Sequence, residues 1–434
     1  MEVADESLNH PKGISFLFFT EMWERMSFYG MRAILIFYLV QELGMSDADA
    51  GEIYALYTSL VYLTPIIGGY LADQFLGYKR SVYLGSFLIL LGHVSLAIPG
   101  GFYFYLGLTL LILGTGFFKP NLTTVFGKLY DSKPKIRDSG YTIFYIGINF
   151  GGLFGPIICG TLGELVSWHL GFFSAAIGMA IGILIFYFGS KSLPDELWEI
   201  KPKKEFLNHS NIPSDKTNET SLLGRLALIL LLSFFSIFFW MSFEQMGSSL
   251  NLFALRQTDR FIFGYEIPAA VLQSLNPMFI LLFGPLLSSF WTKLAKKQLD
   301  PNPVVKFIYS LFFLGLGFLV MVFAAKIAET GVLVSVFFLF FLYFWNTVSE
   351  LCLSPVGLSF VSRVAPVKFT SMLMGIWFLS TAFGHYLAGI LSGFQTKLGS
   401  MANFYSIFVI TSWGAGVVLF LIYIWKRKQI RKIA

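Results

Sequence analysis

Charged residues are scarce in this sequence. Asp, Glu, Lys and Arg together make up 13% of its 434 residues, whereas hydrophobic residues make up 56%. A soluble domain carries about 25% charged residues, because its surface must face water. The composition therefore predicts that most of the surface of this protein faces lipid.

Cysteines and the common catalytic motifs are also missing or few. The two cysteines, Cys159 and Cys352, lie inside apolar runs, which excludes a disulfide framework. The chain has no nucleotide-binding GxxxxGK[ST] sequence, no repeated filter loop, no metal-ligand cluster and no nucleophile–base arrangement. These absences argue against a self-contained ATP-driven pump, a metal site and an enzyme, and we expect no cofactor.

Long apolar runs are what the sequence has instead. About twenty apolar residues in a helix cross a hydrocarbon core about 30 Å thick. Twelve such runs predict an all-α, polytopic membrane protein. The predicted transmembrane helices are residues 14–40, 51–72, 80–98, 102–126, 139–163, 169–189, 221–252, 267–292, 304–326, 331–360, 369–394 and 402–425.

A polar stretch at 190–220, rich in Lys, Glu, Asn, Ser and Pro, divides these runs into two sets of six. We predict an N-terminal six-helix bundle at 1–189, a linker at 190–220, and a C-terminal bundle with a basic tail at 221–434. Two such halves are typical of transporters in which the halves rock about a central site. A channel would not need this organisation.

Most of the 31 Lys and Arg residues fall on one side of the predicted membrane. Basic residues are retained in cytoplasmic loops, so this bias places both termini and the linker in the cytoplasm. We expect a multi-pass protein of the plasma (cell inner) membrane that functions as a monomer. The net charge of +6 then reflects topology and anionic lipid, and we expect no nucleic-acid partner.

A few charges inside the predicted spans carry the functional argument. Glu21, Glu24, Arg25 and Arg32 share one face of the first span. A charged side chain at the bilayer centre costs roughly 2.5–3.5 kcal/mol, so such residues persist where they face a watery cavity or one another. The alternative interpretation is a salt-bridge cluster that only holds helices together.

Three further charges lie in later spans. Lys119 is in the fourth span, where we expect Pro120 to interrupt the helix, and Glu244 and Glu350 are in the seventh and tenth. The first half thus has an excess of bases within the membrane, and the second half has only acids. A zwitterion, such as a peptide, has charges that match such halves.

The proton carrier is expected to be a carboxylate. The spans with these charges contain no histidine, and we expect His93 and His385, in the third and eleventh spans, to be packing residues. Burial raises the pKa of a carboxyl group and a nearby cation lowers it, so breaking an ion pair would drive proton uptake.

Residues 21–30 (EMWERMSFYG) resemble the ExxERFxYYG motif of proton-dependent oligopeptide transporters, a branch of the major facilitator superfamily. Other stretches similar to that family follow in the same order, at 68–73, 116–121, 144–152, 274–277 and 354–358. The resemblance covers most of the chain and implies the major facilitator fold.

The resemblance also implies roles for individual residues. The residues expected to take part in proton coupling are Glu21, Glu24, Arg25 and Glu244. Those expected to bind substrate are Tyr29, Arg32, Tyr62, Lys119, Asn149, Asn276, Glu350, Trp377 and Ser380. Several of these polar and aromatic residues could equally be helix–helix contacts.

Pairings and gates are implied as well. Glu244 would pair with Arg32, and Lys119 with Glu350 when substrate is absent. Asp73 would belong to a cytoplasmic helix-end contact. Apart from the resemblance, Asp47 and Arg256 lie near the outer ends of the second and seventh predicted spans, and we expect them to form an outer gate.

We therefore expect a proton-coupled symporter that imports di- and tripeptides by alternating access, with the peptide, protons and the lipid bilayer as its partners. Phe28 stands where the family usually has Tyr, so one pocket hydroxyl is missing. This departure leaves open another small solute, such as nitrate, an amino acid derivative or a drug-like zwitterion. A non-transporting membrane sensor is a third interpretation.

Overall fold

The computed structural model describes residues 9–131, 133, 136–193, 198, 219–365, 370–395 and 397–433. The chain divides into two compact units. Unit 1 comprises Met1–Ile34 and Leu63–Asp215, and unit 2 comprises Leu35–Tyr62 and Lys216–Ala434. The predicted linker at 190–220 lies largely outside the described residues, and the bundles 1–189 and 221–434 stay predictions.

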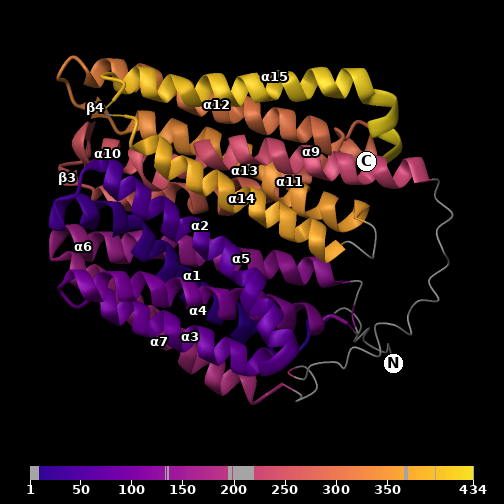
Figure 1. Ribbon diagram of the computed structural model, residues 1–434, viewed down its shortest axis with the longest axis horizontal. Coiled ribbons are helices and arrows are strands. Elements are labelled where there is room, and N and C mark those ends of the chain that lie inside the picture. The colour runs from indigo at the N-terminus through magenta and orange to yellow at the C-terminus, as the bar shows by residue number, and fades with distance from the viewer. Residues whose placement is uncertain are drawn as a thin grey trace. The chain divides into compact units, whose positions relative to one another are not determined.

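Helices follow the predicted apolar runs along the described chain (Figure 1). The first six spans are α1 (Ile14–Phe37) with the short π-helix η2 (Tyr38–Glu42), α2 (Asp47–Leu71) with η3 (Ala72–Leu76), α3 (Tyr78–Leu96), α4 (Gly101–Lys128), α5 (Arg137–Gly155) with η5 (Pro156–Gly160) and α6 (Thr161–Leu165), and α7 (Trp168–Ser190). The next six are α9 (Glu219–Phe243) with η7 (Glu244–Gly247) and α10 (Ser249–Arg256), η8 (Ala269–Ser274) with α11 (Leu275–Lys296), α12 (Pro303–Ala328), α13 (Phe337–Val364), α14 (Thr370–Ser392) and α15 (Met401–Ile433).

The predicted all-α fold is confirmed. Strands occur in the described residues only as two-residue pieces outside the helices: β1 (Thr258–Asp259) pairs with β4 (Val334–Ser335), and β2 (Phe261–Ile262) pairs with β3 (Tyr265–Glu266). Within the described residues, ten helical segments are long and apolar enough to cross a membrane. The charges of α1 keep it out of that set, because every 18-residue stretch of it holds at least three of them.

The predicted interruption at Pro120 is wrong. Helix α4 runs without a break from Gly101 to Lys128 with Pro120 inside it. A proline removes one backbone donor but does not have to end a buried membrane helix, because neighbouring helices and side chains compensate. The backbone group that Pro120 leaves without its usual donor is the carbonyl of Gly116, four residues earlier in the helix.

In unit 1, helix α3 packs along α4 and α7. Helix α1 packs closely on α5 through glycines. A Cβ atom built on Gly151 would lie 2.4 Å from the Met22 carbonyl oxygen, and one on Gly155 would lie 2.6 Å from that of Met26. The absence of side chains on α5 therefore lets the backbone of α1 approach this helix closely, with the stem of Arg25 at the contact.

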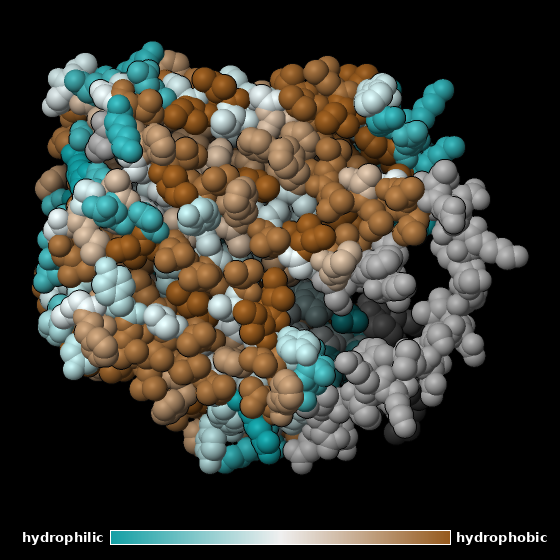
Figure 2. Space-filling view, in the orientation of Figure 1, coloured by the Kyte–Doolittle hydropathy of each residue, from teal (hydrophilic) through white to brown (hydrophobic). Residues whose placement is uncertain are grey.

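In unit 2, helix α12 packs between α13 and α15, and α9 packs on α14 (Figure 1). The outward face of α15 is apolar, as Figure 2 shows, with Ile410, Val417 and Leu421 exposed. The start of α2 also packs on α14, where a Cβ atom on Gly389 would lie 2.4 Å from the carbonyl oxygen of Gly51. Such close backbone packing through small residues is typical of membrane helices.

Glu329, just after α12, caps the start of α15. Its carboxylate accepts hydrogen bonds from the Ala402 backbone N–H at 3.0 Å and from the Ser400 hydroxyl at 2.8 Å. The backbone N–H of Ala402 is the main cause that holds the pKa of Glu329 below its ordinary value, with help from Ser400 and Lys326.

We predict that Glu329→Gln lowers the free energy of unfolding at neutral pH by at most about 1 kcal/mol, the scale of a lost helix cap. A carboxyl group with a lowered native pKa contributes stability above its unfolded pKa and loses it as the pH falls through the native one. The difference between variant and wild type should therefore shrink in acid. Thermal unfolding in detergent at several pH values measures this, and a pH-independent difference would contradict it.

Candidate functional site

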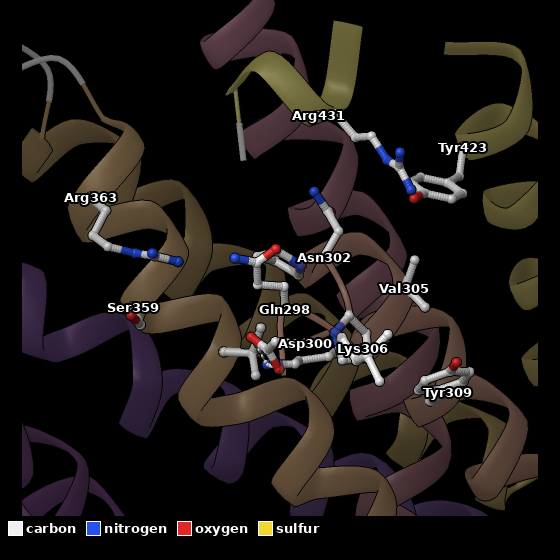
Figure 3. Close-up of a pocket in the computed structure, with 14 residues that line it drawn as sticks. Gln298, Asp300, Asn302, Val305, Lys306, Tyr309, Ser359, Arg363, Tyr423 and Arg431 are labelled. Atoms are coloured by element: carbon white, nitrogen blue, oxygen red, sulfur yellow. Dashed lines mark hydrogen bonds and ion pairs between the residues drawn. The ribbon is translucent and has the colours of Figure 1, made fainter. Parts of the chain in front are cut away.

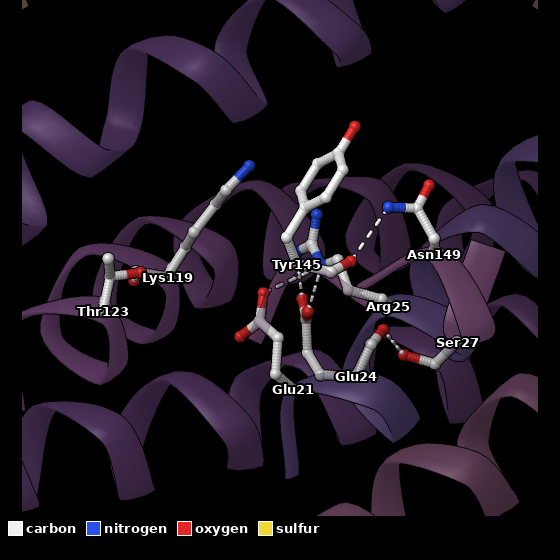
Figure 4. A network of polar contacts seen from close by, with 8 residues as sticks. All are labelled: Glu21, Glu24, Arg25, Ser27, Lys119, Thr123, Tyr145 and Asn149. Carbon is white, nitrogen blue, oxygen red and sulfur yellow. Dashed lines mark hydrogen bonds and ion pairs between the residues drawn. The ribbon is translucent and has the colours of Figure 1, made fainter. Parts of the chain in front are cut away.

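The buried charges of α1 form one ion cluster. Arg25 donates hydrogen bonds from Nε and Nη2 to the two carboxylate oxygens of Glu24. Its Nε also lies 3.6 Å from Oε1 of Glu21. Figure 4 shows both carboxylates turned toward the guanidinium group. The three residues are at most 2% exposed, so two buried carboxylates share one buried cation within about one turn of the same helix.

Helix α5 positions this cluster. A Cβ atom on Gly151 would lie 2.7 Å from Cβ of Arg25, so only glycine admits the arginine stem at this place. Asn149, from the same stretch of α5, is buried and donates its amide to the Tyr145 carbonyl at 2.9 Å. Figure 4 places Tyr145 and Asn149 beside Arg25. The polar side chains of α5 and the charges of α1 therefore share one region of unit 1.

Two aromatic rings of α1 lie next to both arginines. The Arg25 guanidinium carbon is 4.7 Å from the ring centroid of Phe28, and that of Arg32 is 5.3 Å from the ring centroid of Tyr29. An arginine within about 6 Å of an aromatic ring face gains a cation–π attraction. A phenylalanine supplies this attraction as a tyrosine would. Phe28 is 4% exposed, so the ring is part of the packed core.

Lys119 of α4 adds a further cation to the region of the α1 cluster. It extends from α4 on the side of the cluster where Glu21 lies (Figure 4), and it is electrostatically coupled to Arg25, Glu21 and Glu24. The region thus contains Arg25, Arg32 and Lys119 against two carboxylates. This excess of positive charge suits an anionic group on a ligand.

Glu244, the acid predicted in the seventh span, has a histidine neighbour in unit 2. Its Oε2 lies 3.5 Å from Nδ1 of His385 on α14, and both side chains are at most 3% exposed. The His385 ring is 4.5 Å from the Tyr62 ring and 5.6 Å from the Trp240 ring, measured between centroids. The expectation that His385 only packs between helices missed this contact. The sequence feature that points His385 toward the other polar residues of α14 is the four-residue spacing of Trp377, Thr381 and His385, which puts them on one helix face.

The second acid, Glu350 on α13, is held by an amide. Asn276 at the start of α11 donates from Nδ2 to Glu350 Oε2 at 2.9 Å, and the same nitrogen lies 3.1 Å from the Thr347 hydroxyl. This amide helps to orient the Glu350 carboxylate without adding a charge.

The model of the POT family matches residues 79–209 and 199–407. The peptide transporter YePEPT of Yersinia enterocolitica subsp. palearctica serotype O:3 is 34% identical to this chain over 88% of each chain. The di-/tripeptide transporter of Lactococcus lactis subsp. cremoris is 32% identical over 95% of each. This chain belongs to the POT family.

Solved structures of POT proteins have the same fold. A mutant of the peptide transporter POT in complex with alafosfalin superimposes with a TM-score of 0.88, is 32% identical, and covers 98% of this chain and 96% of its own. A POT family transporter in complex with 5-aminolevulinic acid has a TM-score of 0.86 at 29% identity and covers 97% of each chain. The predicted major facilitator fold is confirmed by these neighbours.

Other predicted residues of this POT protein have structural contacts. Trp377 is 3% exposed and lies against Gly357, where a Cβ atom would be 2.2 Å from its ring. The Ser380 hydroxyl lies 2.9 Å from that of Ser236 on α9. Both residues therefore fix α14 against its neighbours, and their predicted role in binding substrate stays a prediction.

The two residues predicted to form the outer gate, Asp47 and Arg256, make an ion pair. Arg256 donates two hydrogen bonds to the carboxylate of Asp47, at 2.7 and 2.9 Å, within unit 2. Asp73 is exposed in η3 and accepts a hydrogen bond from Tyr78. The predicted pairs Glu244–Arg32 and Lys119–Glu350 each join residues of different units and stay predictions.

We predict that Gly151→Ala destabilises the protein by roughly 1–3 kcal/mol, the usual cost of overpacking a close contact. The new methyl group would meet the Met22 carbonyl and the stem of Arg25. The matched control is Gly375→Ala on α14, where no atom lies within 4 Å of the added Cβ. Thermal unfolding in detergent compares them, and equal midpoints would contradict the account of α5.

Proposed function

We propose that this protein is a proton-coupled symporter that imports di- and tripeptides by alternating access. One observation carries the proposal: the polar region of unit 1 holds three cations against two carboxylates, whereas unit 2 presents the acids Glu244 and Glu350 beside an imidazole and an amide. A peptide is a zwitterion with separated charges. The POT relatives named for peptides support this choice of cargo.

The substrate roles follow from charge. Arg32 and Lys119 receive the peptide carboxylate, because they add two cations to the region of the α1 cluster beyond the one that Arg25 supplies. Glu350 receives the peptide amine, because it is an acid within α13 whose carboxylate is oriented by the Asn276 amide. Tyr29, Tyr62, Asn149, Asn276, Trp377 and Ser380 complete the proposed substrate set.

The proton roles follow from competition for the buried carboxylates. Glu21 and Glu24 share one guanidinium group, so any movement of Arg25 leaves a buried carboxylate that favours the protonated form. Glu244 has a titratable neighbour in His385. We assign proton coupling to Glu21, Glu24, Arg25 and Glu244.

The setting of this activity is also proposed. The protein is a multi-pass membrane protein, and we place it in the plasma membrane with both termini in the cytoplasm, acting as a monomer. The proton gradient supplies the energy, and no cofactor, metal or enzymatic step is part of the mechanism. Asp47 and Arg256 form the outer gate, and Asp73 belongs to a cytoplasmic contact.

We predict that proteoliposomes with this protein accumulate a labelled dipeptide when the proton gradient points inward. Unlabelled di- and tripeptides should compete, because they carry the same paired charges. A non-peptide zwitterion is the second candidate cargo, favoured by the missing hydroxyl at Phe28 and by the POT neighbour in complex with 5-aminolevulinic acid. Competition by amino acid derivatives, with peptides inert, would replace peptide by that cargo.

Glu244→Gln should abolish gradient-driven accumulation while it leaves dipeptide exchange across the membrane intact. Glutamine keeps the size of the side chain but cannot take up a proton. The control is Glu42→Gln, which removes an exposed carboxyl group at the end of η2. Full concentrative uptake by the Glu244 variant would remove this residue from coupling.

Reversal of the outer pair tests the gate. Asp47→Arg and Arg256→Asp should each slow uptake of a labelled dipeptide several-fold, since a partly exposed ion pair contributes up to about 1 kcal/mol. The double variant should recover most of the rate, because the charges again attract. A double variant as slow as the singles, at equal expression and thermal stability, would contradict a gating role for the pair.

A further inference from the structure

Unit 2 contains a cavity that the proposed transport cycle does not use. It has a volume of ≈ 810 Å³ and lies between the start of α12 and the ends of α13 and α15 (Figure 3). In the figure, Arg363 reaches in from α13, Arg431 comes from α15 beside Tyr423, and Lys306 of α12 lies next to Asp300. The predicted topology puts this end of unit 2 at the cytoplasmic face of the membrane.

The lining of the cavity is positively charged. It carries Lys306, Arg363 and Arg431 against a single acid, Asp300. Lys306 is buried and already engaged, with its Nζ 2.8 Å from Asp300 Oδ1 and 4.7 Å from the Trp291 ring centroid. In the described part of the chain, no carboxylate lies within ion-pair distance of Arg363 or Arg431. Two arginines are thus available to an anion.

The guanidinium groups, rather than the start of α12, would hold that anion. Asn302 caps this helix by accepting a hydrogen bond from the Val304 backbone N–H at 2.9 Å, so the first backbone donor is used internally. A guanidinium group matches a phosphate with two parallel hydrogen bonds. The neighbouring hydroxyl groups of Tyr309 and Tyr423 add donors.

An apolar groove lies along helices α12 and α15. It has a volume of ≈ 310 Å³ and is lined by Ile308, Phe312, Trp413, Gly416, Val417 and Phe420. The polar atom of Trp413, Nε1, donates to the Phe312 carbonyl at 3.1 Å, which leaves the groove hydrophobic. Phe312 and Phe420 are each three residues, about one helical turn, from Tyr309 and Tyr423 of the cavity, on the side toward the middle of α12 and α15.

A basic cavity at the end of the helices and an apolar groove closer to their middle match the two parts of a phospholipid. Anionic lipids make the cytoplasmic leaflet negative, and basic pockets between helices on that side bind their head groups. We propose that unit 2 binds one anionic phospholipid, with its phosphate at Arg363 and Arg431 and an acyl chain in the groove between α12 and α15.

Native mass spectrometry in neutral detergent tests this site with dioleoyl phosphatidylglycerol and dioleoyl phosphatidylcholine as probes. The wild type should bind phosphatidylglycerol in preference to phosphatidylcholine. The double variant Arg363→Gln/Arg431→Gln should bind phosphatidylglycerol at least about tenfold more weakly, because it loses both cations at the head group. Arg363→Lys/Arg431→Lys keeps the charge but not the paired hydrogen bonds and should fall between the two.

The matched control is Arg427→Gln/Lys428→Gln, which removes two exposed basic residues of α15 that do not line the cavity. It should bind phosphatidylglycerol as the wild type does. Equal weakening in both double variants, or none in either, would overturn the site. Binding of inorganic phosphate or glycerol phosphate that depends on Arg363 and Arg431, with no preference for phosphatidylglycerol, would overturn the lipid assignment in favour of a soluble phosphate.

Discussion

The buried ion cluster of α1 is the constraint on which the rest of unit 1 depends. Arg25, Glu21 and Glu24 lie on a membrane helix, where an uncompensated charge costs several kcal/mol, so they must stay within reach of one another. Their burial requires a neighbouring helix without side chains at the contact, and the glycines of α5 meet that need. The fold therefore holds charge in a place from which lipid is excluded. Such buried charges are useful to a transporter, because the binding of a ligand or a proton can change which residues pair with one another.

The acids of unit 2 are stabilised in a different way. Glu350 accepts a hydrogen bond from Asn276, and Glu244 has His385 as its neighbour. One of these neighbours is a neutral amide, and the other is a titratable imidazole. Unit 1 supplies surplus cations, and unit 2 supplies acids that a proton or an amine can neutralise. That asymmetry connects peptide recognition with proton coupling in one electrostatic scheme.

Much of this fold could be predicted from the sequence, since apolar length and charge position are local properties. The helices follow the predicted runs, and the shared face of Glu21, Glu24 and Arg25 follows from helical periodicity. The missed features depend on helices distant in sequence. The contact of Glu244 with His385 needs the register of α9 against α14, and the continuity of α4 through Pro120 needs packing from its neighbours. The basic cavity likewise exists only where α12, α13 and α15 meet.

The central claim is that the cations of unit 1 recognise the peptide carboxylate. Calorimetric binding of a dipeptide and of its C-terminal amide, to wild type and to Arg32→Gln/Lys119→Gln, tests it as a double-mutant cycle. The account predicts that the wild type binds the amide much more weakly than the acid. The double variant should bind the amide and the acid about equally well. If the two penalties simply add, the carboxylate and these cations do not interact, and the account is contradicted.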